Sequence, residues 1–530
     1  MNENIKSGIT FGIIGGLLTF LFGGWSVAVI GIIMAIGLGL ALSNRFDRKA
    51  PLKLALEALP AGITAGVVLT IFSLLENAVI EPAIGKTQSF DSVVIFANLI
   101  GLLGTIFFVS LMVAFHGLSI RQETMGKLIV LGLYIAAFPF IDSFTGLRWT
   151  AQIIFALIFV ILGMGLNIVV GYAGLLDLGY AAFFAIGAYT TGILSSPQHN
   201  IFLNFWLVIW IAAGMGSIFG FILGAPTLPL RGDYLAIVTL GFGEIVPVLF
   251  RNLIDVTIKE PFSCWILPGV IRLFGGNTVM SCITFMSHED LTAGEKGINP
   301  IGRPYLPFVG EFQSSNTTPW YFLIIAIILL SIFLINRLRE SRLGRAWMAI
   351  REDELAAAQM GINPVRTKLL AFSMGATFSG FAGAFYASYI AGIFPSVFDF
   401  SASIIILCCV ILGGIGNIYG VIVGGLALMT ADRLFLPALK DFLKGLLDHT
   451  ILPALSSNHT LQAAVAANAN PILYRFLLFG LTLVIMMAVR PEGLVPSAQR
   501  RMELHEGDEA AGPVGVEPTA EPQPKRKSKQ

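Results

Sequence analysis

A charged stretch between two long apolar runs is the feature that most constrains the fold of this chain. Residues Asn336–Lys368 contain seven Arg or Lys and four Asp or Glu, and they lie between the apolar runs Tyr321–Ile335 and Leu369–Ile390. A charged side chain at the centre of a bilayer costs about 3 kcal/mol or more, so this stretch must face water while its neighbours can cross a membrane. The excess of Arg and Lys is typical of a cytoplasmic loop.

Apolar runs and short charged stretches alternate along the whole chain. Its 530 residues are 55% apolar and 12% charged, whereas soluble domains carry about 25% charged residues. Because a helix needs about 20 residues to cross a bilayer, the runs predict an all-α polytopic membrane protein with about 14 transmembrane helices. The predicted spans are Ile9–Leu42 as a hairpin turning at Gly23-Gly24, Leu54–Leu75, Ser92–Phe115, Leu128–Phe144, Ala151–Val170, Ala181–Leu194, Phe202–Leu223, Leu235–Phe250, Trp320–Ile335, Leu369–Ile390, Ser401–Thr430 as a hairpin turning at Gly413–Asn417, and Ile472–Val489.

The spans divide the chain into three predicted parts. Residues 1–126 form a membrane extension of four spans, and residues 127–496 form a ten-helix core with an extracytoplasmic loop at 251–319 and the cytoplasmic loop at 336–368. Residues 497–530 are rich in Pro and charged residues, which predicts disorder. Every Arg/Lys-rich loop then falls on one side, with both termini in the cytoplasm.

The charged stretch itself contains a predicted helix. Ala346–Met360 has a helix-forming composition, and Gly361 followed by Asn363-Pro364 is a stop signal. A short charged helix held between two spans can transmit force to a soluble partner. A solvated connector of no further function would have the same composition.

Glycine-rich breaks interrupt two of the apolar runs, at Gly171–Tyr180 and Gly413–Asn417. Broken helices at membrane depth are tolerated only inside protein or beside a water-filled path. The two breaks follow spans of opposite direction, which hints at an inverted repeat with a pathway at its interface. The candidate pathway residues are Gly171, Gly174, Tyr180, Glu244, Gly413, Gly414 and Gly416.

Two acids lie within apolar runs, Glu244 and Asp177. An ionisable side chain in a membrane span is a functional candidate, and Glu244 could bind a coupling cation if the chain were an ion-coupled transporter. Either acid could instead cap a helix or lie near a membrane surface, and this second interpretation is favoured for Asp177.

Small residues recur at four-residue spacing in several spans, a pattern that lets helix backbones approach closely in lipid. The stripes are Ala212/Gly216/Gly220/Gly224, Ala376/Gly380/Ala384/Ser388 and Gly416/Gly420/Gly424. They indicate helix packing and imply no chemistry.

Motifs of catalysis are missing from the sequence. Gly85-Lys86-Thr87 lacks the earlier glycine of a P-loop, and His288-Glu289 lacks the second histidine of a zinc protease. The net charge of +1 and the lack of a basic cluster with interleaved aromatic residues predict no nucleic-acid partner. We therefore expect a conduit that is not an enzyme and binds no metal or cofactor.

Several segments resemble the LivM-type permeases of bacterial branched-chain amino-acid ABC importers, in order and at similar spacing from about residue 127 to residue 496. These segments are Gly165–Gly174 (GLNIVVGYAG), Gly179–Tyr189 (GYAAFFAIGAY), Leu230–Ile245 (LRGDYLAIVTLGFGEI), Leu291–Gly294 with Gly297-Ile298, Gly344–Glu354 (GRAWMAIREDE), Leu412–Gly416 and Arg490–Leu494 (RPEGL).

The resemblance implies a transport subunit of the bacterial inner membrane that moves leucine, isoleucine, valine or related amino acids inward. It implies a second homologous permease, two cytoplasmic ATPase subunits that bind ATP and magnesium, and an extracytoplasmic binding protein. Urea or short amides are an alternative substrate class, and a scaffold or receptor is a further alternative.

In this family the charged stretch resembles a coupling helix that docks on the ATPase, over Gly344–Gly361. The implied coupling residues are Gly344, Arg345, Arg351, Glu352, Glu354 and Gly361.

The four cysteines fall in two places. Cys264 and Cys282 lie in the predicted extracytoplasmic loop with 17 residues between them, so a disulfide there would contribute about 3 kcal/mol. Cys408 and Cys409 lie in an apolar run and are expected to be packing thiols. Relative to the family, residues 257–288 and 431–470 contain extra sequence.

Overall fold

Apolar helices make up nearly all of the computed structural model, which describes residues 3–495 apart from 23–24, 44, 47, 49, 81–91, 200–202, 228–232, 255–290, 308–309, 452–470 and 491. The longer helices are α1 (Glu3–Phe22), α2 (Ser26–Ser43), α3 (Pro51–Leu75), α5 (Ser92–Ala114), α6 (Ile120–Thr145), α7 (Trp149–Asn167), α8 (Ala181–Ser195), α9 (Phe205–Thr227), α10 (Asp233–Asn252), α12 (Thr317–Glu340), α13 (Arg342–Glu352), α15 (Pro364–Ile390), α16 (Phe400–Gly413), α17 (Ile418–Thr430), α18 (Leu436–Leu446) and α21 (Arg475–Val489). A six-residue helix, α14 (Glu354–Gln359), follows α13, and two short strands, β1 (Tyr305–Leu306) and β2 (Gly310–Glu311), pair antiparallel.

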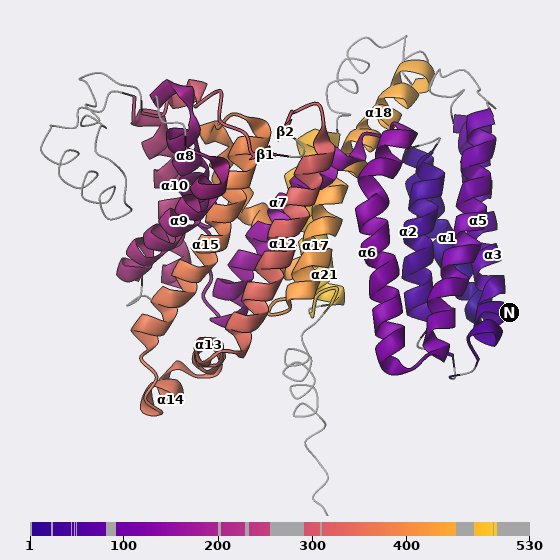
Figure 1. Cartoon of the computed structure of the whole chain (residues 1–530), viewed down its shortest axis with the longest axis horizontal. Helices are drawn as coiled ribbons and strands as arrows, with labels where there is room; N and C mark the ends of the chain where they lie inside the picture. Colours follow the sequence, from indigo (N-terminus) through magenta and orange to yellow (C-terminus); the bar gives the residue numbers. More distant parts are fainter. Residues whose placement is uncertain are drawn as a thin grey trace, which may run out of the picture.

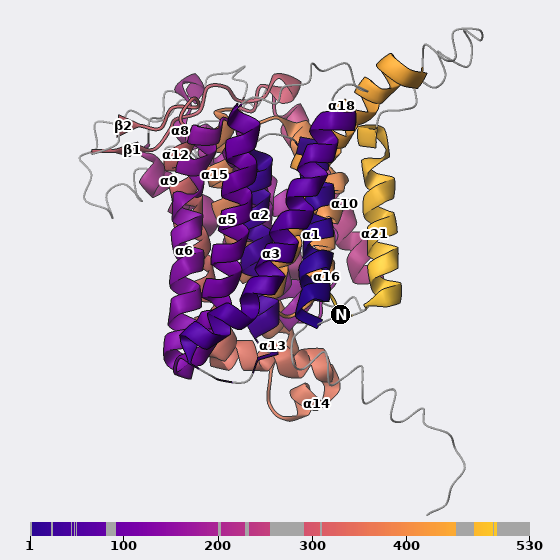
Figure 2. The same ribbon diagram turned by 90° about the vertical axis from the view of Figure 1, so that its right-hand side faces the viewer.

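The predicted class, an all-α polytopic membrane protein, is confirmed. Within the described residues, 11 helices are long and apolar enough to cross a membrane. Three more predicted crossings coincide with α1 and with the shorter apolar helices α8 and α16. Helices end on either side of both predicted hairpin turns, although Gly23-Gly24 lie outside the described residues. Helices α13 and α14 lie at one end of the bundle, and the β-hairpin and α18 lie at the other (Figures 1 and 2).

Helices α1, α2, α3 and α5 pack against one another beside α6, apart from the remaining helices (Figure 1). Aromatic contacts join this group to the rest: the ring centroids of Phe22 and Trp149 are 5.1 Å apart. Near the start of α6, the buried carboxylate of Glu123 lies 2.7 Å from Lys127 Nζ, 3.0 Å from His116 Nδ1 and 3.3 Å from Arg48 Nη2. These contacts fasten the loops of the N-terminal helices to α6.

Six of the remaining helices pack in two matching sets that run in opposite directions. The long helix α15 packs on α8 and α9, and the long helix α7 packs on α16 and α17. Each short helix also packs on the helix that follows it, α8 on α9 and α16 on α17, while α7 and α15 contact each other directly. This exchange of partners is what an inverted repeat produces.

The predicted small-residue stripes lie at these contacts. A Cβ added to Gly216 of α9 would lie 2.5 Å from the carbonyl oxygen of Ala376 on α15, and a Cβ on Gly220 would lie 2.8 Å from that of Phe372. A Cβ on Gly380 of α15 would meet Ala212 O at 2.5 Å. The first two stripes therefore face each other, and their backbones are too close for any larger side chain.

The predicted end of a span at Thr430 coincides with the end of α17, and the chain continues as a helical run to His449. A π-helical turn, Ala431–Phe435, leads directly into α18, whose second residue is Pro437. In the first turn of a helix the missing proline N–H interrupts no hydrogen bond, so α18 can begin there.

Replacing Gly216 by Val should destabilise the protein by about 1–3 kcal/mol or more, because the added atoms overlap the backbone of α15. The matched control is Gly214→Val on the same helix, where a Cβ has open space within 4 Å. The measurement is the temperature at which the purified protein in detergent loses its monodisperse peak. Equal melting temperatures for the two variants would contradict the packing of α9 on α15.

Candidate functional site

The charged segment, residues 336–368, forms two helices where the sequence predicted one over Ala346–Met360. Helix α13 ends at Glu352, and Asp353 has extended backbone angles (φ −152°, ψ 109°). Its carboxylate accepts hydrogen bonds from the backbone N–H groups of Leu355 and Ala356, at 2.8 and 3.0 Å. Asp353 therefore acts as the N-cap of α14 and divides the predicted helix.

The predicted stop signal of the charged segment is confirmed. Gly361 has a φ of +87°, a conformation that favours glycine at a helix end. The side chain of Asn363 then accepts a hydrogen bond from the N–H of Arg366 and caps α15, with Pro364 as its first residue. The charged segment therefore ends at the capped start of α15.

The apolar residues of the segment divide into two groups. Trp347 is fully buried, and its Nε1 donates to the carbonyl oxygen of Thr367 at 2.7 Å. Ile350 is also buried, whereas Leu355 and Met360 are 70% and 85% exposed. One group fixes α13 to α15, and the other faces away from the bundle.

The six implied coupling residues lie in different surroundings. Gly344 is buried, and a Cβ there would lie 2.5 Å from Leu338 O at the end of α12. Arg345 is exposed and donates to Glu340 O, while Glu352 is exposed at the end of α13. Glu354 forms an ion pair of 2.7 Å with the buried Lys368.

Arg351 joins α13 to the first glycine break. Its Nη1 donates to the carbonyl oxygen of Gly171 at 2.7 Å, and a Cβ on Gly174 would lie 3.0 Å from Arg351 Cγ. The guanidinium of Arg339 lies 5.9 Å from the centre of the Tyr172 ring. The charged segment is therefore in direct contact with the end of the α7 span.

The two glycine breaks meet each other. Helix α7 ends in a π-helical turn, Ile168–Tyr172, and the side chain of Asn167 accepts a hydrogen bond from the N–H of Gly416 at 2.9 Å. A Cβ on Gly171 would lie 2.8 Å from that same nitrogen. Positive φ angles at Gly174 (+69°) and Gly416 (+84°) explain why glycine occupies these turns.

The segment after α21 completes this cluster, a role that sequence reasoning missed. The N–H groups of Leu494 and Val495 donate to the carbonyl oxygens of Leu412 and Gly413, at 2.9 and 3.0 Å. Asn417 Nδ2 donates to Val495 O at 3.0 Å. The resemblance of Arg490–Leu494 to the family was the only signal for it.

The structure brings some candidate pathway residues together and separates others. Gly171 of the first break lies beside the turn between α16 and α17, which follows Gly413 and contains Gly414 and Gly416, whereas Gly174 lies beside Arg351. Tyr180 is buried, and its hydroxyl donates to Gly375 O at 2.7 Å. Glu244 is exposed on α10.

At the opposite end of the bundle, the loop before β1 contacts the ends of α10 and α15. Ile298, in the loop before β1, forms a β-bridge with Ile393, which follows α15. Arg251 at the end of α10 forms ion pairs with Glu295 of that loop, at 3.1 Å, and with Asp399 before α16, at 3.4 Å.

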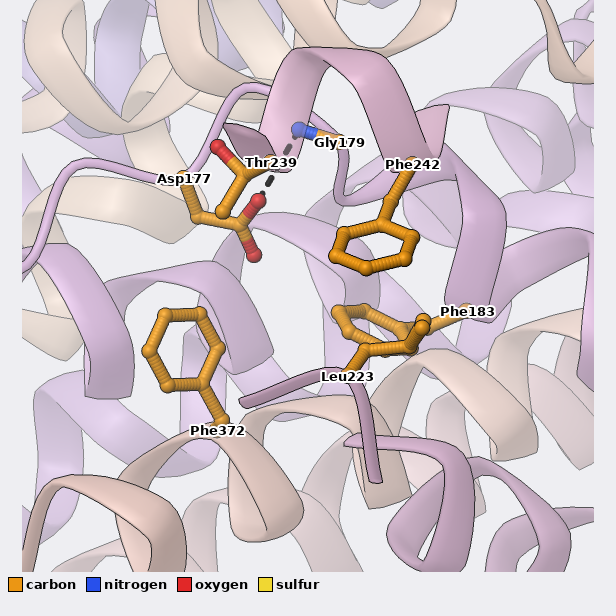
Figure 3. A pocket seen from close by; sticks show the side chains of 7 residues that line it. All are labelled: Asp177, Gly179, Phe183, Leu223, Thr239, Phe242 and Phe372. Atoms are coloured by element: carbon orange, nitrogen blue, oxygen red, sulfur yellow. Dashed lines mark hydrogen bonds between the residues drawn. The ribbon is translucent and has the colours of Figure 1, made fainter. Parts of the chain in front are cut away.

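Asp177 lies in the loop between α7 and α8, beside a small cavity of about 10 Å³ (Figure 3). It is 1% exposed, and its Oδ1 accepts a hydrogen bond from Gly179 N at 2.9 Å. The carboxyl group of Asp177 is thus deeply buried in protein, and the expectation that it lies near a membrane surface or caps a helix stays a prediction.

The predictions of no metal site and of a disulfide both stay predictions. Among the described residues, no group of three or more His, Cys, Asp or Glu side chains could hold a metal ion. Cys408 and Cys409 are buried and free. Cys264 and Cys282 lie outside the described residues, so their disulfide stays a prediction.

Known proteins are similar to this chain over most of its length. The sequence profile described as "Branched-chain amino acid transport system / permease component" matches residues 150–486. The LivM permease protein of the high-affinity branched-chain amino acid transport system of Escherichia coli K12 is 36% identical over 74% of this chain and 80% of its own length.

Two further relatives match smaller shares of this chain. A probable branched-chain amino acid transport permease protein LivM of Methanocaldococcus jannaschii is 23% identical over 63% of this chain and 84% of its own. The LivH permease protein of Escherichia coli K12 is 36% identical over 128 residues, which is 23% of this chain and 40% of LivH. No solved structure gives a significant match.

Proposed function

The chain belongs to the family of permease components of branched-chain amino acid transport systems, and we propose that it is a transmembrane subunit of an ABC importer. It moves leucine, isoleucine, valine or a related hydrophobic amino acid into the cytoplasm. The observation that carries this proposal is the charged segment, which contacts the breaks of the membrane helices on one side and exposes apolar side chains on the other.

The proposed partners supply what this chain lacks. Two cytoplasmic subunits bind ATP and magnesium and hydrolyse the nucleotide, and a binding protein outside the membrane delivers the amino acid. The complex lies in the bacterial inner membrane, with both termini of this chain in the cytoplasm, because the Arg/Lys-rich loops then lie on that side.

A second, homologous permease is the proposed partner within the membrane. The similarity of this chain to the LivH permease proteins supports such a pair. One face of α10 is exposed at Tyr234, Ile237 and Glu244. A carboxyl group that faced lipid alone would be unfavourable, so we assign this face to the contact with the second permease, where Glu244 would border the pathway.

The ATPase subunit docks on the exposed apolar pair Leu355 and Met360. These side chains are 70% and 85% exposed at the far end of the charged segment, away from the buried Trp347. Large apolar side chains surrounded by charged residues are typical of a docking surface.

Force then passes from the ATPase to the membrane helices through α13. The helix is fixed to α15 by Trp347, and Arg351 holds the carbonyl oxygen of Gly171. Since Asn167 links the same break to Gly416, a displacement of α13 reaches both halves of the inverted repeat. The breaks are packed closed in this conformation, so transport requires that this cluster separate.

The transport proposal is tested by uptake of labelled leucine into proteoliposomes that hold the full complex, with and without internal ATP. We expect ATP-dependent uptake that urea does not compete. Uptake without ATP would overturn the ABC assignment in favour of ion coupling and direct attention to Glu244. ATP-driven urea uptake without leucine uptake would keep the architecture and discard the substrate, and a lack of any flux would indicate a scaffold or receptor.

The double substitution Leu355→Ser, Met360→Ser should weaken assembly with the ATPase by about tenfold or more, because large apolar side chains at the centre of an interface can cost over 1 kcal/mol when truncated. Leu52→Ser is the control, since Leu52 is 75% exposed at the start of α3, in the N-terminal helices. The measurement is co-purification of the ATPase with the tagged permease. Equal recovery from both variants would exclude this docking surface.

Arg351→Ala should reduce the leucine transported per ATP hydrolysed, because α13 then loses its hydrogen bond to Gly171. The ATPase should still assemble, since the exposed pair is untouched. Arg121→Ala is the control, because Arg121 is exposed in the first turn of α6. A parallel fall of transport and ATP hydrolysis, with their ratio unchanged, would contradict a coupling role for this arginine.

A further inference from the structure

The carboxyl group of Asp177 is a buried acid that the transport proposal leaves without a role. One of its oxygens, Oδ1, accepts the hydrogen bond from Gly179 N. The other, Oδ2, has no hydrogen-bond partner in the part of the chain that the structure describes. In Figure 3 the carboxyl group points into the space between the rings of Phe372, Phe183 and Phe242.

The walls of this cavity supply no charge to balance a carboxylate. Leu223 of α9, Phe242 of α10 and Phe372 of α15 present apolar side chains to it. The hydroxyl of Thr239 also lines the cavity, but it already donates to Ala236 O at 3.0 Å and accepts from Leu178 N at 3.1 Å.

Titratable groups near Asp177 are equally few. Among the described residues, the phenol of Tyr180 is the titratable group that interacts with this carboxyl group, and its hydroxyl donates to Gly375 O. Glu244 also belongs to α10, but it lies on the exposed side of that helix. No Arg or Lys lines the cavity within the described chain.

An ionised carboxylate in such surroundings would be strongly destabilising, so its charge must be neutralised. A metal cation needs a shell of oxygen ligands, whereas this wall consists mainly of aromatic and aliphatic carbon. The cavity of about 10 Å³ has room for about one water molecule. A proton is the one neutralising ligand that needs neither space nor further ligands.

We propose that Asp177 is a proton-binding site, protonated and neutral in this conformation of the protein. The site lies within the break that Arg351 holds, a few residues after Gly171 and Gly174. A movement of α13 that draws this loop out of the bundle would admit water to the cavity and release the proton to it. The proposal concerns the chain itself and holds for any transported solute.

Infrared spectroscopy of the purified full-length protein in lipid nanodiscs, near neutral pH, tests the protonation state directly. The difference spectrum between the wild type and Asp177→Asn should contain the carbonyl stretching band of a protonated carboxylic acid. Asp441→Asn is the control, because Asp441 is exposed on α18 and should give no such band. If Asp177→Asn does not fold, isotope-labelled aspartate should shift the same band in the wild type.

Carboxylate bands in place of the acid band would overturn the proposal. If those bands moved when sodium was exchanged for choline, the site would hold a metal cation, and the proton assignment would equally fail. Because the readout is spectroscopic, a failed transport assay leaves this result unaffected.

Thermal melting gives a second measurement with a definite sign. An exposed Asp ionises near pH 4, so between about pH 5 and about pH 7 the unfolded chain is ionised at this residue while the folded chain is neutral. The wild type should therefore lose stability as the pH rises through this range, relative to Asp177→Asn. Identical pH slopes of the melting temperature would contradict a neutral Asp177.

Discussion

Close contact between helix backbones is the interaction on which the rest of this structure depends. In a bilayer the hydrophobic effect does not hold helices together, so packing of small residues must do so. Gly216 and Gly220 bring α9 against α15, and the same type of contact joins α16 to α17, where a Cβ on Gly420 would lie 2.5 Å from Gly413 O. Only such tight pairs can hold short helices like α8 and α16 inside the bundle, because neither spans it alone.

Short helices create a second constraint, since the backbone at their ends leaves polar groups inside the membrane that must be satisfied by protein. Side chains from distant parts of the chain do this. Asn167 accepts from Gly416 N, and Ser403 accepts from Ala181 N at 3.0 Å. Thr239 accepts from Leu178 N, and Arg351 donates to Gly171 O. The last of these bonds comes from the charged segment, so the segment that faces the proposed ATPase also completes the hydrogen bonding of a membrane helix.

Predictions from the sequence succeeded where the signal was local. Apolar runs located the spans, and the small-residue stripes proved to lie at helix contacts, as in the pairing of Gly216 with Ala376. The prediction of one helix over Ala346–Met360 was wrong. Composition favours a helix through Asp353, but its carboxylate accepts hydrogen bonds from the N–H groups of Leu355 and Ala356 and so begins a second helix. The boundary at Thr430 coincides with the end of α17, beyond which a π-helical turn leads into α18.

By itself, the sequence determined the membrane class, the position of the spans, the charged segment and the family resemblance, because each depends on residue types over a short window. The tertiary structure alone decided which residues meet. Nothing in the sequence links Arg351 to Gly171, or Asn167 to Gly416, because these pairs are separated by 180 and 249 positions. The surroundings of Asp177 were equally hidden, since its cavity is built from four helices and the loop that contains it. Burial and partner choice are properties of the assembled bundle, and they decide that the carboxyl group of Asp177 lies among apolar side chains.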